Sequence, residues 1–137
     1  MSINFTPDFW GPHGWIFLHS ITFNYPKNPT NNDKMKYKNF FESIGDILPC
    51  EKCSINYKEH IRNHPINNHL NTKSQLIKWL IDIHNMTNQE LNKPILSYEE
   101  VMYEYRSKID NKSIYSKCIY ILVFIVFCCL IYFAYIN

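Results

Sequence analysis

The sequence is poor in glycine, with only three Gly in 137 residues, and it has seven prolines. Folds built from many short strands need frequent turns, so this composition favours helices joined by short connections. An excess of charge of one sign is also lacking, because 14 basic residues stand against 12 acidic ones. With no basic stripe along the chain, nucleic acid is not expected as a partner. The 46% of hydrophobic residues is enough for the core of one domain.

One long stretch lacks charge altogether. Residues 118–136 read CIYILVFIVFCCLIYFAYI and contain no charge, glycine or proline. As a helix this stretch would be about 28 Å long, close to the ~30 Å hydrocarbon core of a bilayer. Four basic residues shortly precede it: Arg106, Lys108, Lys112 and Lys117. Without a signal-peptide pattern at the N-terminus, this flanking charge predicts a single-pass, tail-anchored membrane protein whose residues 1–117 face the cytosol.

Prolines and capping signals divide the rest of the chain into helices. We expect helices at about residues 7–23, 34–47, 50–63, 72–91 and 97–109. The predicted fold class is therefore all-α: a four-helix bundle with a short fifth helix, followed by a C-terminal transmembrane helix. The expected domain covers residues 1–110, a polar joint covers 111–117 and the membrane anchor covers 118–136.

The stretch LPCEKC at residues 48–53 places Cys50 and Cys53 three positions apart. On a helix, two such residues share a face and can approach bonding distance. The positive end of the helix dipole favours thiolate, which is the form that attacks disulfides. The motif therefore predicts a redox-active pair, with two inert buried cysteines as the simpler alternative.

Two other interpretations of this motif are open. His60 and His64 follow the cysteines with a spacing that suits a Cys2His2 zinc site, although the middle spacer is short for a ββα finger. We expect these histidines instead on the exposed outer face of the third helix. A thioredoxin-like fold needs strands beside the C-x-x-C, whereas residues 40–48 repeat at helical period. The rival function is a membrane-anchored zinc-binding interaction module.

A dithiol that becomes a disulfide must pass two electrons onward, and oxygen accepts them poorly from thiols directly. A cofactor is therefore expected. Two stretches combine aromatic, histidine and asparagine side chains that could hold a flat heterocycle: WGPHGWIFLH at residues 10–19 and WLIDIHNMTNQELNKP at residues 79–94. For each tryptophan by itself, and for His19, core packing is the alternative.

These stretches resemble the FAD-linked sulfhydryl oxidases of the Erv/ALR type. Residues 10–19 are similar to the signature W-G-x-x-x-W-x-x-L-H, and residues 50–53 to the C-x-x-C that follows a proline. Residues 84–94 resemble H-N-x-V-N-x-x-L-G-K-P. This third stretch departs from the signature at Thr87, where Val is usual, and at Asn92, where Gly is usual.

The resemblance implies a helical bundle around FAD, with Cys50 and Cys53 as the catalytic pair and Cys53 nearer the flavin. It implies cofactor contacts at Gly11, Trp15, His19, Trp79, His84, Asn85, Asn88 and Lys93. Electrons would pass from a thioredoxin-like or other dithiol protein through the pair to FAD and then to oxygen, releasing hydrogen peroxide. The resemblance also implies a homodimer. Small forms of this kind resemble those of large DNA viruses, which suggests the host cytoplasm or a virion membrane.

Two departures from the family concern its other cysteines. Ile81 and Tyr98 stand where many members carry a second, structural disulfide. Its stabilisation, typically ~2–4 kcal/mol, must then come from packing or dimer contacts. The remaining cysteines, Cys118, Cys128 and Cys129, all lie in the predicted anchor. We therefore expect a minimal FAD-dependent thiol oxidase that receives electrons straight from its partner.

Overall fold

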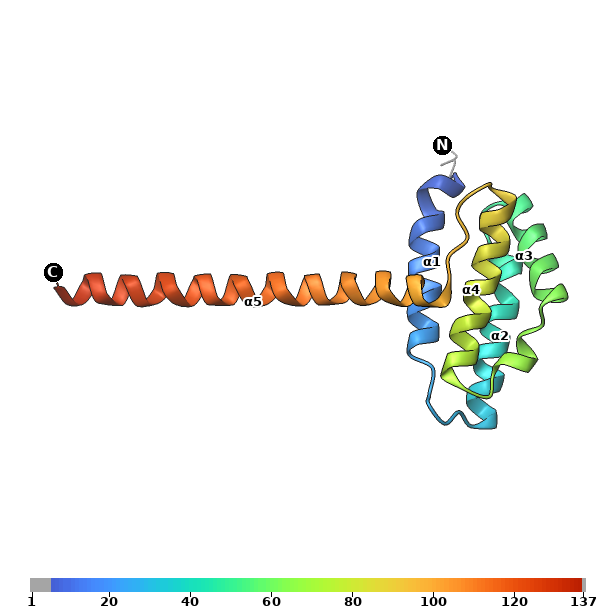
Figure 1. Ribbon diagram of the computed structural model, residues 1–137, viewed down its shortest axis with the longest axis horizontal. Helices are drawn as coiled ribbons and strands as arrows, with labels where there is room; N and C mark the ends of the chain where they lie inside the picture. Colours follow the sequence, from blue (N-terminus) through green and yellow to red (C-terminus); the bar gives the residue numbers. More distant parts are fainter. Residues whose placement is uncertain (1–5, 137) are drawn as a thin grey trace. The chain divides into compact units, whose positions relative to one another are not determined.

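The computed structural model describes residues 6–136, except for the side chains of residues 111–118, 130 and 132–136. The elements of this part are α1 (Pro7–Phe23), α2 (Asn31–Ile47), α3 (Glu51–Asn63), the 3₁₀ helix η1 (Ile66–His69), α4 (Lys73–Glu90) and α5 (Tyr98–Ile136) (Figure 1). The predicted all-helical class is confirmed. The chain divides into two compact units, Met1–Ser97 and Tyr98–Asn137, which are described one at a time.

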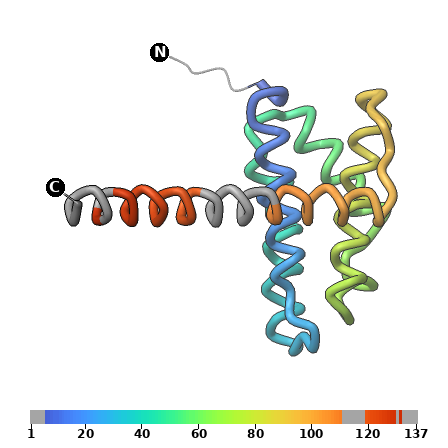
Figure 2. The backbone as a smooth tube through the Cα atoms, turned by 60° about the vertical axis from the view of Figure 1, so that its left-hand side comes forward, coloured from blue at the N-terminus to red at the C-terminus, as the bar shows by residue number. Residues whose placement is uncertain are grey.

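In the first unit, α1 to α4 run alternately in opposite directions (Figures 1 and 2). Helix α4 contacts α1, α3 and η1, while α2 contacts α3. The start of α1, the start of α3 and the end of α4 therefore lie at the same end of the bundle. The core between the helices consists of Tyr25, Phe41, Ile44, Tyr57, Ile66, Leu70, Leu76, Trp79, Leu80 and Ile83.

Helix α2 begins earlier than the sequence pattern predicts. Its start at Asn31 is set by a capping box, in which Thr30 Oγ1 accepts from the backbone N–H of Asp33 at 3.1 Å. The Asp33 carboxylate in turn accepts from the backbone N–H of Thr30 at 2.9 Å. The predicted start at residue 34 is wrong, because an Asp at the fourth box position closes the same pair of bonds as Glu or Gln. The Thr30 hydroxyl, which donates to the Asp33 carboxylate at 2.7 Å, and then the Thr30 N–H hold the pKa of Asp33 below its ordinary value.

Two hydrogen bonds fix α3 against the backbone of α2. The Ser54 hydroxyl donates to the carbonyl of Gly45, and the Tyr57 hydroxyl donates to the carbonyl of Phe41 at 2.8 Å. Gly45 makes this close approach possible, because a Cβ there would lie 2.7 Å from Cγ of Lys58. The position of α3 therefore depends on the absence of a side chain at Gly45, which faces Tyr57 and Lys58.

The second unit is one continuous helix of 39 residues, α5. The predicted end of the fifth helix near Ile109 is wrong, because α5 continues through residues 111–117, the expected polar joint. No proline or glycine occurs between Tyr98 and Ile136, so nothing in the covalent chain interrupts the helix.

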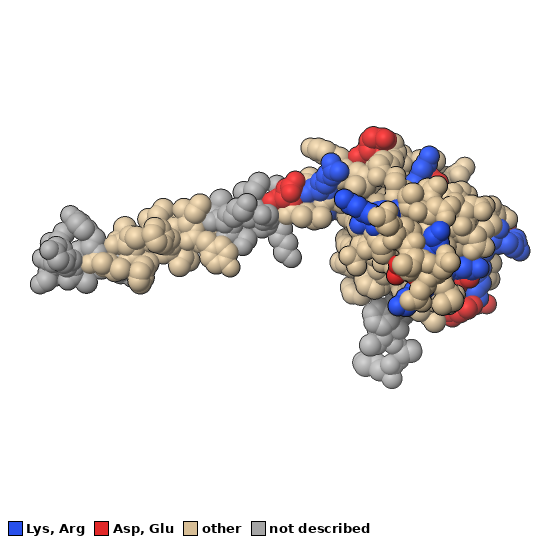
Figure 3. All heavy atoms as spheres, turned by 90° about the horizontal axis from the view of Figure 1, so that it is seen from below, with Lys and Arg blue, Asp and Glu red and all other residues tan. Residues whose placement is uncertain are grey.

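No helix among the residues with described side chains is both long enough and apolar enough to cross a membrane. The predicted span 118–136 includes residues 118, 130 and 132–136, which lie outside the described side chains. The side chains of residues 119–129 are exposed, and this part of the helix carries no charge in Figure 3.

Charged residues of the first unit are scattered over the face shown in Figure 3, with acidic side chains among the basic ones. Several form exposed pairs, such as Lys58 with Asp46 at 2.7 Å and Arg62 with Glu59 at 3.7 Å. Exposed pairs of this kind add little to stability, so the fold depends on its core.

Candidate functional site

The two cysteines of the C-x-x-C motif are joined by a disulfide, with their Cα atoms 5.2 Å apart. Cys50 is the N-cap residue of α3, and its Sγ accepts from the backbone N–H of Cys53 at 3.2 Å. Both residues are partly exposed, so an external thiol can reach the bond. Because the Cys50 sulfur lies at the positive end of α3, the helix dipole favours its thiolate after reduction.

Three predicted cofactor residues meet between α1 and α4. The rings of Trp15 and His84 are stacked, with centroids 3.9 Å apart and planes 9° apart. His19 follows Trp15 by one helical turn, and its Nε2 lies 3.2 Å from Nδ1 of His84. The structure therefore brings Trp15, His19 and His84 into one cluster of rings, which we call the ring cluster.

His19 is the most buried member of the ring cluster, at 1% exposure. Burial, and then the charge of His84, lower the pKa of His19 to about 3. His19 is therefore neutral near pH 7. A hydrogen bond between the two facing nitrogens then needs one proton, carried either by Nε2 of His19 or by Nδ1 of His84.

Asn85 and Asn88 hold the segment that follows α4. The Asn85 amide donates to the carbonyl of Leu96 at 2.8 Å and accepts from the Leu96 N–H at 3.1 Å. The Asn88 amide donates to the carbonyl of Pro94 at 3.1 Å, and the backbone N–H of Lys93 donates to the Asn88 carbonyl at 2.8 Å. The hydrogen bonds of both asparagines thus keep the Lys93 segment folded back along α4.

Asn92 makes this reversal possible. It lies just beyond Leu91, the C-cap of α4, with a φ of 51°. Glycine adopts this left-handed conformation at no steric cost, and asparagine tolerates it better than most residues. The backbone therefore explains why the signature usually has Gly where this chain has Asn92.

Trp79 lies apart from the ring cluster. It is fully buried, it donates from Nε1 to the carbonyl of His64 at 2.8 Å, and its ring packs edge-on against Phe41. Five positions separate Trp79 from His84, which places them on different sides of α4. The structure does not bring Trp79 together with the other predicted cofactor residues.

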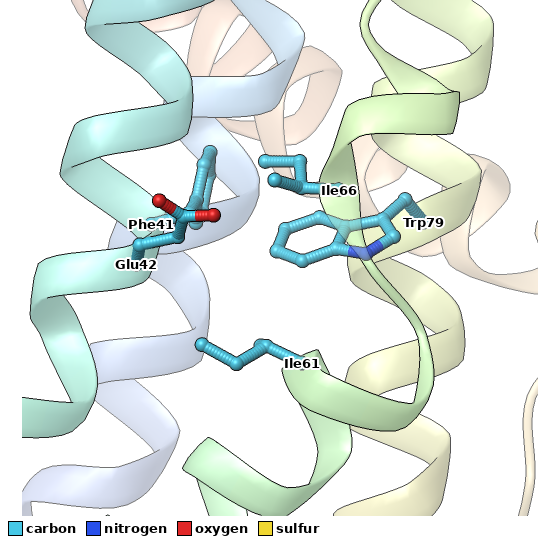
Figure 4. A pocket seen from close by; sticks show the side chains of 5 residues that line it. All are labelled: Phe41, Glu42, Ile61, Ile66 and Trp79. Atoms are coloured by element: carbon cyan, nitrogen blue, oxygen red, sulfur yellow. The ribbon is translucent and has the colours of Figure 1, made fainter.

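A small cleft beside Trp79 is shown in Figure 4. Its lining consists of Phe41, Glu42, Ile61, Ile66 and Trp79. It has room for no more than about one water molecule. A flat heterocycle does not fit there, so this cleft belongs to the packing between α2, α3, η1 and α4.

The surface near the ring cluster, in contrast, suits a flat aromatic group. Trp15 and His84 are each partly exposed, and a Cβ at Gly11, one turn before Trp15, would meet no atom within 4 Å. Accessible rings and open backbone together fit the requirements of FAD.

The rival zinc interpretation finds no support in the part of the chain that the structure describes. No three His, Cys, Asp or Glu side chains lie there in a group that could hold a metal ion. Cys50 and Cys53 are bonded to each other. The His60 side chain is only 11% exposed and its Nε2 lies 3.3 Å from Glu90 Oε1, so its expected position on the outer face of α3 is wrong.

Comparison with known proteins identifies the family to which this chain belongs. The sequence model of the Erv1 / Alr family matches residues 12–106, which is well over half of the chain. The chain belongs to the Erv1 / Alr family. The match includes the C-x-x-C, the ring cluster and the asparagine-held segment, all of which lie in the first unit or at its edge.

Relatives within the Erv1 / Alr family occur in a virus and in yeast. A protein of Acanthamoeba polyphaga mimivirus, named "Probable FAD-linked sulfhydryl oxidase R368", is 43% identical over 98 residues, which cover 71% of this chain and 68% of the relative. The mitochondrial FAD-linked sulfhydryl oxidase ERV1 of Saccharomyces cerevisiae is 33% identical over 85 residues, covering 61% and 43%. The crystal structure of the yeast Erv1 core superposes with a TM-score of 0.65 at 27% identity, covering 70% of this chain and 80% of that one.

Proposed function

We propose that this chain is an FAD-dependent thiol oxidase that makes disulfide bonds in partner proteins. The observation that carries the proposal is the partly exposed Cys50–Cys53 disulfide at the start of α3, in a bundle that also holds the ring cluster. Its relatives in the Erv1 / Alr family are named FAD-linked sulfhydryl oxidases, which supports the same reaction.

The exchange begins when a substrate thiolate attacks the Cys50 sulfur. A mixed disulfide forms, the Cys50–Cys53 bond breaks, and Cys53 leaves as a thiolate. The second substrate thiolate then attacks the substrate sulfur of the mixed disulfide and displaces Cys50. The products are a substrate disulfide and a reduced Cys50/Cys53 pair. The reduced Cys50 and Cys53 side chains would then give up two electrons and two protons and re-form their disulfide. FAD held beside them would supply the redox chemistry that transfers these electrons to oxygen as hydrogen peroxide.

The cofactor would be held by residues with different tasks. Trp15 and His84 offer aromatic surface, and Gly11 leaves the backbone of α1 open beside them. His19 is buried and would act through its contact with His84. Lys93 is exposed, and its positive charge suits the phosphates.

Other predicted cofactor residues would act mainly by positioning neighbouring parts of the chain. Asn85 and Asn88 position the Lys93 segment by their hydrogen bonds, and each keeps one amide donor for the cofactor. Trp79 supports α4 from the core, and its direct contact with the cofactor stays a prediction.

The electron donor would be a thioredoxin-like or other dithiol protein, which exchanges directly with Cys50. A homodimer through α1 and α2 is supported by exposed apolar side chains on both helices: Phe9, Ile16, Phe17 and Met35. Packing of these side chains between two copies would remove them from water.

We also propose that residues 118–136 anchor the protein in a membrane, with the oxidase domain at 1–110 and a joint at 111–117. The absence of charge in this stretch and the basic residues before it support the anchor and a cytosolic oxidase. The mimivirus relative supports a setting in the host cytoplasm or at a virion membrane.

The test measures flavin absorbance, zinc content and thiol oxidation in the same preparations. The purified chain should show flavin absorbance and should oxidise dithiothreitol with release of hydrogen peroxide. Cys53→Ser should keep the flavin and lose thiol oxidation, while Cys128→Ser, at an exposed free cysteine of α5, should keep both. A colourless protein that binds stoichiometric zinc and loses it in Cys53→Ser would contradict the oxidase and support the zinc module.

A further inference from the structure

Glu90 is the last residue of α4, where the helix dipole disfavours a negative charge. Two side chains of α3 face its carboxylate. Asn56 donates from Nδ2 to Oε2 at 2.5 Å, and Nε2 of His60 lies 3.3 Å from Oε1, within ion-pair distance although not aligned as a hydrogen bond. A carboxylate in this position therefore depends on α3 for its partners.

The two partners of Glu90 share one face of α3 with a redox cysteine. Cys53, Asn56 and His60 are spaced by three and then four residues, which aligns them along the helix. Asn56 lies one turn after Cys53, so the hydrogen bond between Asn56 and Glu90 is one helical turn from the disulfide. The same hydrogen bond joins α3 to α4, the helix that carries His84.

The other polar contacts of α3 among the described residues lie elsewhere. Ser54 and Tyr57 bind the backbone of α2, and the carbonyl of His64, at the far end of α3, accepts from Trp79. Among the described residues, the Glu90–Asn56 hydrogen bond is the side-chain contact that joins the first two turns of α3 to α4. The Glu90–His60 contact joins α4 to the last turn of α3.

We propose that Glu90 is a positioning residue for the redox pair. By holding Asn56, it keeps the first turns of α3 in place against α4 and so keeps Cys50 and Cys53 at bonding distance. This proposal rests on the proposed function in one respect, that Cys50–Cys53 is the working disulfide. Loss of the Glu90–Asn56 contact should loosen the start of α3 and make the disulfide easier to reduce.

The test is the equilibrium of the full chain with reduced and oxidised glutathione, read by thiol alkylation and mass spectrometry of the Cys50/Cys53 peptide. This equilibrium needs neither flavin nor oxygen, so it can succeed if the oxidase proposal fails. The variants are Glu90→Ala, Glu90→Gln and Asn56→Ala. Glu59→Ala is the matched control, because Glu59 is an exposed carboxylate of α3 paired with Arg62 at 3.7 Å.

Glu90→Ala and Asn56→Ala should each shift the equilibrium toward the dithiol at least about threefold, and the double variant should shift it no further, because both remove one contact. The Gln side chain of Glu90→Gln has the same size and shape as Glu and can still accept a hydrogen bond from Asn56. The equilibrium of this variant should therefore stay close to that of the unmodified chain, as should that of Glu59→Ala. A wild-type equilibrium in Asn56→Ala, or a Glu90→Gln shift as large as that of Glu90→Ala, would overturn the proposal. The second result would assign the effect to charge.

Discussion

The ring of Trp15 on α1 lies parallel to the ring of His84 on α4, with 3.9 Å between centroids. Removing the indole by Trp15→Ala should weaken FAD binding about five- to tenfold, because a stacked aromatic contact contributes about 1 kcal/mol or more. Flavin fluorescence during titration measures the change. His13→Ala, at an exposed ring on the same helix, is the control and should bind FAD as before. Equal affinity in both variants would place the cofactor elsewhere.

Acid should destabilise the fold through His19. The unfolded chain binds a proton at this side chain below its ordinary pKa of 6.5, whereas the folded chain does so only near a pKa of about 3. Stability is therefore fully present above pH 6.5 and is lost as the pH falls toward about 3, by up to ~1.4 kcal/mol per pH unit.

Urea unfolding of the chain and of His19→Gln across this pH range checks the prediction. Protonation of carboxylates with a lowered pKa, such as Asp33, lowers the free energy of unfolding in acid by the same amount in both proteins. The difference between the two curves therefore isolates His19. Parallel curves would show that His19 is protonated in the folded protein as readily as in the unfolded chain.

Tyr57→Phe should destabilise the first unit by about 1 kcal/mol, because it deletes the buried hydrogen bond from the hydroxyl to the carbonyl of Phe41. Burial and then the charge of Glu42 raise the pKa of Tyr57, so the hydroxyl stays protonated as a donor. Thermal or urea unfolding measures the loss. Tyr103→Phe is the matched control, because Tyr103 is 76% exposed, and it should leave stability unchanged.

Asn92→Gly should raise the free energy of unfolding by up to about 1 kcal/mol, and Asn92→Ala should lower it by about the same amount. The reason is the φ of 51° at this position, which glycine adopts freely and alanine does not. Chemical denaturation of the two variants tests both signs. If Asn92→Gly proved less stable than the unmodified chain, the asparagine side chain would be stabilising the turn by a contact of its own.

Local signals along the chain predicted most of the bundle. The span of α1, Pro7–Phe23, agrees with the Thr-Pro start and the Tyr-Pro stop read from the sequence. The sequence pattern predicts the start of α2 three residues late, because the capping box at Thr30 uses Asp in place of Glu or Gln. It predicts the end of α5 too early, since a polar stretch without glycine or proline does not by itself end a helix.

The candidate site was only partly predictable. Its residue types were found from three short stretches, yet Trp79 lies in the core and His60 faces α4. Glu90 was missed, because a glutamate among many charged residues carries no local signal of its partners. Which face a side chain presents depends on the rotation of its helix, and neighbouring helices set that rotation.

By itself the sequence determined the helical class, the cysteine pair at a helix start and the residue types that suit a flavin, because these follow from spacing and capping along one segment. Only the tertiary structure decided that His84 stacks on Trp15, that Asn85 binds the Leu96 backbone and that Glu90 holds Asn56. Contacts between segments depend on how helices pack and where the chain reverses, and neither is encoded in any one segment.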